Sequence, residues 1–249
     1  MATAIVPDLT FNPEARIQGR YIGKERQPLL VIDNVLKHPE SMVRYAAEQS
    51  VFQTPSERSN YPGLNGDLPP DYAPALARAL RPLLYQGFGI PEKEDISCQG
   101  FFGLTTAQAG ELRPVQCIPH SDSPNPHRLA ILHYFCGQPY GGTAFFRHLP
   151  TGFESVDRRR YAYYRNTVEN ELAVFDTPLA YAGPSTPRYQ QIDHVDAVFD
   201  RLVVYRTTSL HSGIMNDAEL RTDPATGRLT ANTFIEAPPP APVPGVQVP

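Results

Sequence analysis

Residues 128–146, RLAILHYFCGQPYGGTAFF, hold two short apolar runs separated by a turn that contains glycine and proline. Apolar and aromatic runs bounded by turn residues are typical of β-strands. A third such run, LVVYRTTSLHSG, covers residues 202–213 and stops at glycine. The 27 prolines and 17 glycines divide the 249 residues into short segments, which favours a mainly β fold with flanking helices over a helical bundle.

Two histidines and one carboxylate lie beside these runs. His120-Ser121-Asp122 precedes the first run, and His211 lies near the end of the third. Residues i and i+2 of an extended strand point to the same face, so His120 and Asp122 can reach one ion while Ser121 faces away. An H-x-D triplet is common by chance, but His211 completes the ligand set of a non-haem Fe(II) oxygenase. We therefore predict a metal site at His120, Asp122 and His211.

In order and spacing, these elements resemble the prolyl-4-hydroxylase-like branch of the Fe(II)/2-oxoglutarate-dependent dioxygenases. The resemblance covers the H-x-D triplet, the strand at 128–136, the Gly-Gly-Thr strand at 141–146 and the strand that delivers the distal histidine. The next strand, TGRLTANTFI at 226–235, and an opening strand, PLLVIDNVL at 28–36, also match. The resemblance implies a double-stranded β-helix core of the jelly-roll or cupin-like type. It also implies Fe(II) as cofactor, bound by the three predicted ligands, and 2-oxoglutarate as co-substrate.

The resemblance further implies a basic residue that pairs with the far carboxylate of 2-oxoglutarate. Many relatives place it about ten positions after the distal histidine, where this chain has Arg221. Arg221 falls in a polar stretch, residues 216–224, that predicts an inserted loop. Arg228 opens a clear strand, so we predict Arg228 as the anchor and keep Arg221 as the alternative. Tyr134 is a further candidate, as a hydroxyl donor to the same carboxylate.

The activity implied is a 2-oxoglutarate-dependent hydroxylation of a C–H bond in a small molecule or an amino-acid or peptidyl substrate, with desaturation as another outcome. Relatives that halogenate have a small residue in place of the carboxylate, so Asp122 favours hydroxylation. Two alternatives stay open: a cupin-like metalloprotein that does not use 2-oxoglutarate, and a non-catalytic binding module on the same fold. The sequence does not encode the substrate, because specificity in this fold lies in loops.

Length and composition bound the remaining expectations. A chain of 249 residues suits one domain, which we place at 1–236, with N-terminal helices and a flexible proline-rich tail at 237–249. The net charge of −4 and the lack of a basic run exclude nucleic acid as an expected partner. No apolar stretch is long enough to span a membrane and no signal peptide is evident, so we expect a cytoplasmic protein without membrane association. The oligomeric state is left open.

Several other elements are predicted from periodicity. Helices are expected at 38–48, at 71–85 with its end at Gly87, and at 155–172. The last of these carries alternating arginines and tyrosines, which indicate either a basic, aromatic lid over the substrate or a solvated face whose tyrosines pack on the barrel. Residues 54–67 are expected to form a loop. His133 is expected to be buried and hydrogen-bonded, whereas His148 is a weaker candidate for the pocket wall.

Overall fold

The computed structural model describes residues 5–56, 59–90, 96–216 and 219–237. Its three α-helices are α1 (Glu40–Glu48), α2 (Tyr72–Phe88) and α3 (Arg158–Val174). Its strands are β1 (Arg16–Ile22), β2 (Gln27–Asp33), β3 (Gly63–Gly66), β4 (Ser97–Thr105), β5 (Arg128–Tyr134), β6 (Gly142–His148), β7 (Tyr189–Asp196), β8 (Arg201–Arg206), β9 (His211–Ile214) and β10 (Arg228–Glu236).

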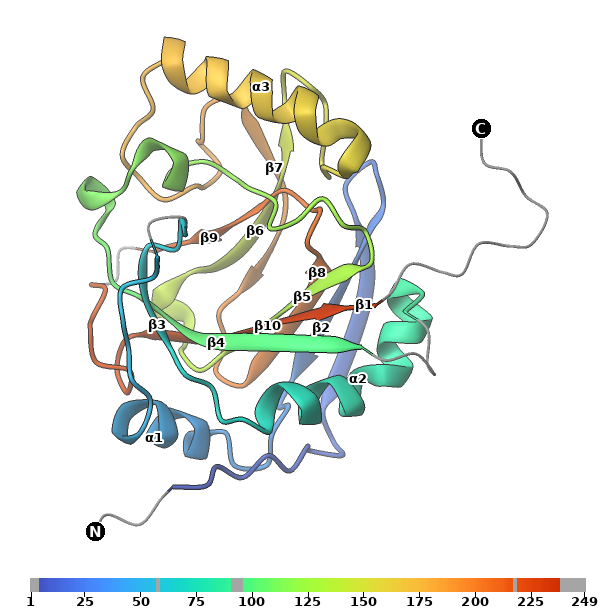
Figure 1. Cartoon of the computed structure of the whole chain (residues 1–249), viewed down its shortest axis with the longest axis vertical. Helices are drawn as coiled ribbons and strands as arrows, with labels where there is room; N and C mark the ends of the chain where they lie inside the picture. The colour runs from blue at the N-terminus through green and yellow to red at the C-terminus, as the bar shows by residue number, and fades with distance from the viewer. Residues whose placement is uncertain (1–4, 57–58, 91–95, 217–218, 238–249) are drawn as a thin grey trace, which may run out of the picture.

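The strands form two antiparallel sheets that face each other (Figure 1). The larger sheet has the order β1-β2-β8-β5-β10-β4-β3, and the smaller has the order β7-β6-β9. From β5 onward the chain passes repeatedly between them: β5 lies in the larger sheet, β6 and β7 in the smaller, β8 in the larger, β9 in the smaller and β10 in the larger. This exchange makes a double-stranded β-helix, or jelly roll, and the predicted fold class is confirmed.

Strand alternation divides the apolar side chains between two cores. On β5, Leu129 and Ile131 point outward and pack with the buried faces of α1 and α2. Ala130 and Leu132 point inward and pack with the smaller sheet through Phe145. In Figure 1, α1 and α2 lie along the larger sheet and α3 lies across the smaller one. The helices therefore shield the outer faces of both sheets, and the space between the sheets is left for a site.

Three details differ from the sequence-based expectations. The run at 202–213 is not one strand: β8 ends at Arg206 and β9 begins at His211, in the other sheet. The predicted loop at 54–67 contains β3, which pairs with β4. Helix α2 continues through Gly87 and ends at Gly89, whose φ of 68° closes the helix in the left-handed conformation. Apolar periodicity alone does not detect the first two features, because they depend on which sheet the chain joins.

At the C-terminal end, the described residues include Ala237, the first residue after the predicted boundary at 236. Ala237 is 1% exposed, packs in the outer core and donates its N–H to the His127 carbonyl. The rest of the predicted tail, residues 238–249, lies outside the described residues. Among the helices that the structure describes, none combines the length and apolar character required to cross a membrane.

His133 is buried and hydrogen-bonded, as predicted. Its Nε2 lies 2.9 Å from Asp200 Oδ1 and its Nδ1 lies 2.7 Å from the Tyr72 hydroxyl. Burial lowers the pKa of His133 and outweighs the opposing effect of Asp200. A neutral imidazole has one donor and one acceptor, so Nε2–H donates to the Asp200 carboxylate and Nδ1 accepts from Tyr72. The contact ties α2 to the central strand β5.

Tyr72→Phe should therefore lower the free energy of unfolding by about 1–3 kcal/mol, the usual effect of leaving a buried acceptor without a partner. Urea denaturation measures this directly. Tyr161→Phe is the matched control, because Tyr161 is 42% exposed and should show no change. An unchanged unfolding midpoint in Tyr72→Phe would show that His133 Nδ1 does not depend on the tyrosine.

Candidate metal centre

His120 and His211 pair directly through their backbones. The N–H of each donates to the carbonyl of the other, and both N···O distances are 2.9 Å. His120 lies in an extended segment outside the named strands, so the strand expected at 120–122 is reduced to this single bridge. In an antiparallel pair, residues that exchange both hydrogen bonds lie opposite each other, with their side chains on the same face of the sheet. The two imidazole rings are accordingly 4.5 Å apart.

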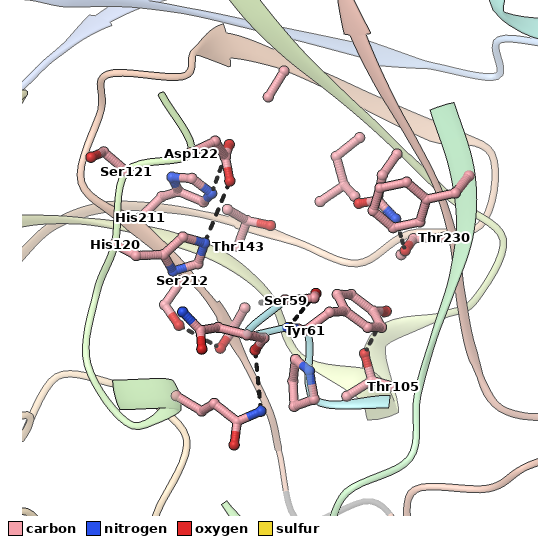
Figure 2. Close-up of a pocket in the computed structure, with 18 of the residues that line it drawn as sticks. Ser59, Tyr61, Thr105, His120, Ser121, Asp122, Thr143, His211, Ser212 and Thr230 are labelled. Atoms are coloured by element: carbon pink, nitrogen blue, oxygen red, sulfur yellow. Dashed lines mark hydrogen bonds and ion pairs between the residues drawn. The ribbon is translucent and has the colours of Figure 1, made fainter. Parts of the chain in front are cut away.

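Asp122 completes a group of three potential ligands. Its two carboxylate oxygens lie 3.6 Å from His120 Nε2 and 3.6 Å from His211 Nε2. One ligand atom from each of the three side chains lies within 4.8 Å of the other two, and Figure 2 shows them pointing toward one another. The Asp122 N–H donates to the Thr207 carbonyl, which fixes the segment against the crossover between β8 and β9. His211 is thus brought next to His120 and Asp122, about ninety positions away in the sequence.

The protonation states suit a cation. Burial lowers the pKa of His211 to about 4, so its imidazole is neutral near pH 7. His211 Nδ1–H donates to the Ser209 carbonyl at 2.9 Å, which leaves the Nε2 lone pair for a metal. Burial alone would raise the pKa of Asp122, but the imidazoles of His211 and His120 and the charge of Arg128 outweigh it. The net shift is downward, so Asp122 is an anionic ligand candidate.

The chain contains a second H-x-D triplet, which shows that this residue spacing alone does not make a three-ligand site. His194 and Asp196 lie on β7 with the same spacing, and His194 Nε2 is 3.9 Å from Asp196 Oδ1. Their side chains are 54% and 53% exposed, and among the described residues no third ligand joins them. The residue spacing is identical in the two triplets. The difference is the strand that brings His211 to the first one.

The three residues lie on the wall of a cavity of about 410 Å³ between the two sheets, which is within the usual range for a small-molecule site. Figure 2 shows the triad on one side of this cavity and Tyr61, Thr105 and Thr230 on the other. Along β10, the residues that alternate into the cavity are Arg228, Thr230, Asn232 and Phe234. The wall therefore changes from charged to apolar along a single strand.

Arg228 is 4% exposed and is held by three acceptors. Its Nε donates to the Tyr140 carbonyl, its Nη2 to the Gly142 carbonyl and its Nη1 to the Thr105 hydroxyl, at 2.9–3.3 Å. A guanidinium has five N–H groups, so two remain, and no carboxylate of the described residues pairs with it. Burial raises the pKa of Tyr134 to about 12, while the positive charge of Arg228 opposes the rise. The cavity thus contains a fixed cation without a counter-ion.

Gly213 lies between the triad and this guanidinium. It is two residues after His211 on β9, so both face the cavity at a spacing of about 7 Å. A methyl group placed on Gly213 would be 3.6 Å from Arg228 Nη2. The glycine therefore leaves space beside the cation that a side chain would occupy.

The other predicted site residues are placed differently. Arg221 is 55% exposed at its side chain, lies 4.0 Å from Glu219 and is not among the cavity-lining residues. Tyr134 is fully buried beneath the cavity wall, where its hydroxyl lies 2.5 Å from that of Thr143. His148 does not line the cavity either, because it is buried between Thr151 and Glu171. On α3, Tyr164 packs toward the barrel whereas Tyr163 is exposed, so the helix is partly a packed face and partly a solvated one.

Several cavity residues lie outside the motifs recognised in the sequence. Tyr61 and Tyr181 come from loops, and their hydroxyls bond Thr105 and the Ala107 carbonyl. Tyr205 lies on β8 with its ring 4.6 Å from that of His211. Burial and the nearby Asp122 raise the pKa of Tyr205 well above its usual value, so it is a neutral phenol. None of these tyrosines belongs to a motif. For Tyr205 the alternation of residues along its strand could have indicated that it faces the cavity.

Comparisons with known proteins give one family, and the solved structures that resemble the chain include two distant ones. A profile described as "Family of unknown function (DUF6445)" matches residues 13–235. The crystal structure of HygX from Streptomyces hygroscopicus with nickel and 2-oxoglutarate bound is 13% identical, with a TM-score of 0.41, over 86% of this chain and 84% of HygX. The crystal structure of EvdMO1 is 13% identical, with a TM-score of 0.35, over 93% of this chain and 56% of EvdMO1. Among curated proteins, none matches the chain significantly.

The geometry predicts that His120→Ala, Asp122→Ala and His211→Ala each weaken divalent metal binding. The loss should exceed the 10–100-fold that changes in outer-shell partners typically cause, because each variant removes a direct ligand. Calorimetric titration of the metal-free protein with Ni²⁺ measures it. His194→Ala is the matched control and should bind like the wild type. Equal affinity in all four variants would exclude the triad as the metal site.

Proposed function

The chain belongs to this family of unknown function, and we propose its activity from the site itself: a non-haem Fe(II)- and 2-oxoglutarate-dependent dioxygenase that hydroxylates a C–H bond. The observation that carries the proposal is the cation at Arg228. A buried guanidinium without an anionic partner is energetically unfavourable, and it lies in the cavity that also holds the triad. A small molecule that carries a carboxylate at one end and metal-binding oxygens at the other would satisfy both features.

The donor set supports iron in particular. Two imidazoles and one carboxylate on one face of an ion leave further coordination positions open, the arrangement of non-haem Fe(II) oxygenases. His120, Asp122 and His211, which line the cavity, would hold the ion. When bound, iron and 2-oxoglutarate would supply the oxidant for the substrate.

The protein's own residues would then position the co-substrate. Arg228 has two N–H groups left to donate, and a fork of this kind can pair with a carboxylate through two parallel bonds. Thr105 and Thr230 line the cavity beside it with hydroxyl groups. Gly213 leaves space beside Arg228, and the neutral Tyr205 excludes water next to His211.

Two finer assignments belong to this proposal. The order of the H-x-D segment, the Gly-Gly-Thr strand and the strand opened by Arg228 supports the prolyl-4-hydroxylase-like branch. The carboxylate at Asp122 supports hydroxylation over halogenation, because it fills a coordination position. The substrate is a small molecule or an amino-acid or peptidyl group, acted on without nucleic acid or membrane.

Arg228→Met should weaken 2-oxoglutarate binding to the Ni²⁺-loaded protein by at least about 2 kcal/mol, the lower end of the effect of removing one partner of a buried charge pair. Arg221→Met is the matched control and should bind like the wild type, since its side chain lies outside the cavity. Calorimetric titration of both variants decides between the two arginines. A loss confined to Arg221→Met would move the anchor to the loop.

Gly213→Val should distinguish co-substrate binding from metal binding. The added methyl groups would occupy the space beside Arg228 Nη2, so 2-oxoglutarate binding should fall while Ni²⁺ binding is retained. The same titrations give both values. Undiminished 2-oxoglutarate affinity would show that the ligand does not run past Gly213.

The activity is tested by succinate formation. The protein is incubated with Fe(II), 2-oxoglutarate and oxygen across pools of candidate substrates, with Asp122→Ala as the inactive control. Substrate-dependent succinate supports the proposal. Metal-dependent product without consumption of 2-oxoglutarate would assign the protein to the cupin-like alternative.

A further inference from the structure

Arg128, the first residue of β5, is a second guanidinium next to the metal centre. Strand alternation places it on the same face as Ala130 and Leu132, which line the cavity. Its Cζ lies 4.9 Å from the ring centroid of Phe234, another cavity residue. Arg128 is therefore the next inward-facing position beyond the lining residues, at the end of the cavity opposite to Arg228.

Its backbone is linked to that of the potential ligand Asp122 through one residue. The Thr207 carbonyl accepts the N–H of Asp122, while the Thr207 N–H donates to the Arg128 carbonyl at 3.1 Å. The Thr207 hydroxyl donates to the same carbonyl at 3.0 Å. The position of Arg128 relative to the triad is thus set by hydrogen bonds and not by a flexible loop.

The Arg128 guanidinium makes no hydrogen bond to any described residue. Its Nε is buried and has no hydrogen-bond partner among the described residues, and its side chain as a whole is 25% exposed. The nearest carboxylate, Glu236, lies 3.9 Å from Nη1, which is beyond hydrogen-bond distance. Glu236 instead accepts from the Asn125 amide at 2.7 Å. Buried donors are nearly always satisfied in folded proteins, so this one requires an explanation.

The two arginines of β8, the strand beside β5, have acceptors for their guanidinium groups. Arg201 pairs with both oxygens of Asp33, at 2.6 and 3.1 Å. Arg206, on the strand adjacent to β5, donates to the carbonyls of Pro126 and Phe88. Arg128 differs from them in that its donors are held in place by the Phe234 ring but reach no acceptor. A planar guanidinium held in this way is suited to a carboxylate.

We propose that Arg128 determines substrate specificity by binding a carboxylate of the substrate, so that the substrate is a carboxylate-bearing small molecule. The inference rests on the proposed function, because it assigns the Arg228 end of the cavity to the co-substrate and the Arg128 end to the substrate. The carboxylate then lies on Arg128 while the rest of the molecule extends past Phe234 and Ala130 toward the triad. Phe101, 6.4 Å from Phe234 between ring centroids, adds an aromatic wall suited to an apolar body.

The test uses metal-free protein and two probes of equal shape, benzoate and benzamide. Nitrogen-15 labelling of the arginines gives one Nε–H signal for each, and Arg128→Lys identifies the signal of Arg128. Benzoate should shift this signal, with an affinity at least about tenfold higher than that of benzamide because only the carboxylate forms a charge-assisted pair. Glu236→Gln should strengthen benzoate binding by removing a nearby negative charge.

Variants separate the two arginines and the two proposals. Arg128→Met should lose the benzoate site, and Arg128→Lys, which keeps the charge and the fold, should bind it more weakly. Arg228→Met should leave the Arg128 response unchanged, and Arg20→Met, at an exposed pair with Asp193, is the control for the lost charge. If benzamide shifts the Arg128 signal as strongly as benzoate, or Arg128→Met retains benzoate affinity when Arg228 is also replaced by Met, Arg128 is only a partner of Glu236. Failure of 2-oxoglutarate to bind at Arg228 would instead contradict the proposed function. Benzoate binding at Arg128 would still stand in that case, because it is measured without metal or 2-oxoglutarate.

Discussion

The site depends on the reciprocal backbone pair between His120 and His211. The two residues are far apart in sequence, and the bridge is the only backbone pairing that holds the H-x-D segment to the smaller sheet among the described residues. Because an antiparallel pair directs opposite side chains to the same face, this one contact brings both imidazoles to the cavity. The Thr207 carbonyl then sets Asp122 by accepting its N–H. Three backbone hydrogen bonds therefore bring the three ligand-bearing segments together.

The crossover between β8 and β9 makes this pairing possible. Residues 207–210 leave the larger sheet after Arg206 and join the smaller one at His211. Along the way Ser209 accepts the Nδ1–H of His211, and Thr207 contacts both the Asp122 segment and the start of β5. The polar residues of the crossover are thus used to orient the site. A continuous strand would have kept His211 in the larger sheet, away from His120.

Charge is distributed unevenly around the cavity. The triad contributes one carboxylate, whereas Arg228 lies at one end and Arg128 near the other, and neither arginine forms a hydrogen-bonded pair with a carboxylate of the described residues. Neutral phenols and hydroxyls occupy much of the wall between them, including Tyr61, Thr230 and Tyr205. In a low-dielectric space such fixed cations favour anionic occupants, and their separation favours two different ones. In the function that we propose, the co-substrate would occupy the Arg228 end of the cavity and the substrate the Arg128 end.

The sequence by itself determined the elements whose signal is local. Apolar runs predicted β2, β5, β6 and β10, periodicity predicted the three helices, and the spacing of His120 and Asp122 predicted that they share a face. Tertiary structure decided everything that depends on which strands pair. It placed His211 outside β8 and paired it with His120, so that one of two H-x-D triplets with the same spacing gained a third potential ligand. It also brought Arg228 rather than Arg221 to the cavity. Strand pairing is a long-range interaction between segments that carry similar local patterns, so local sequence does not specify it.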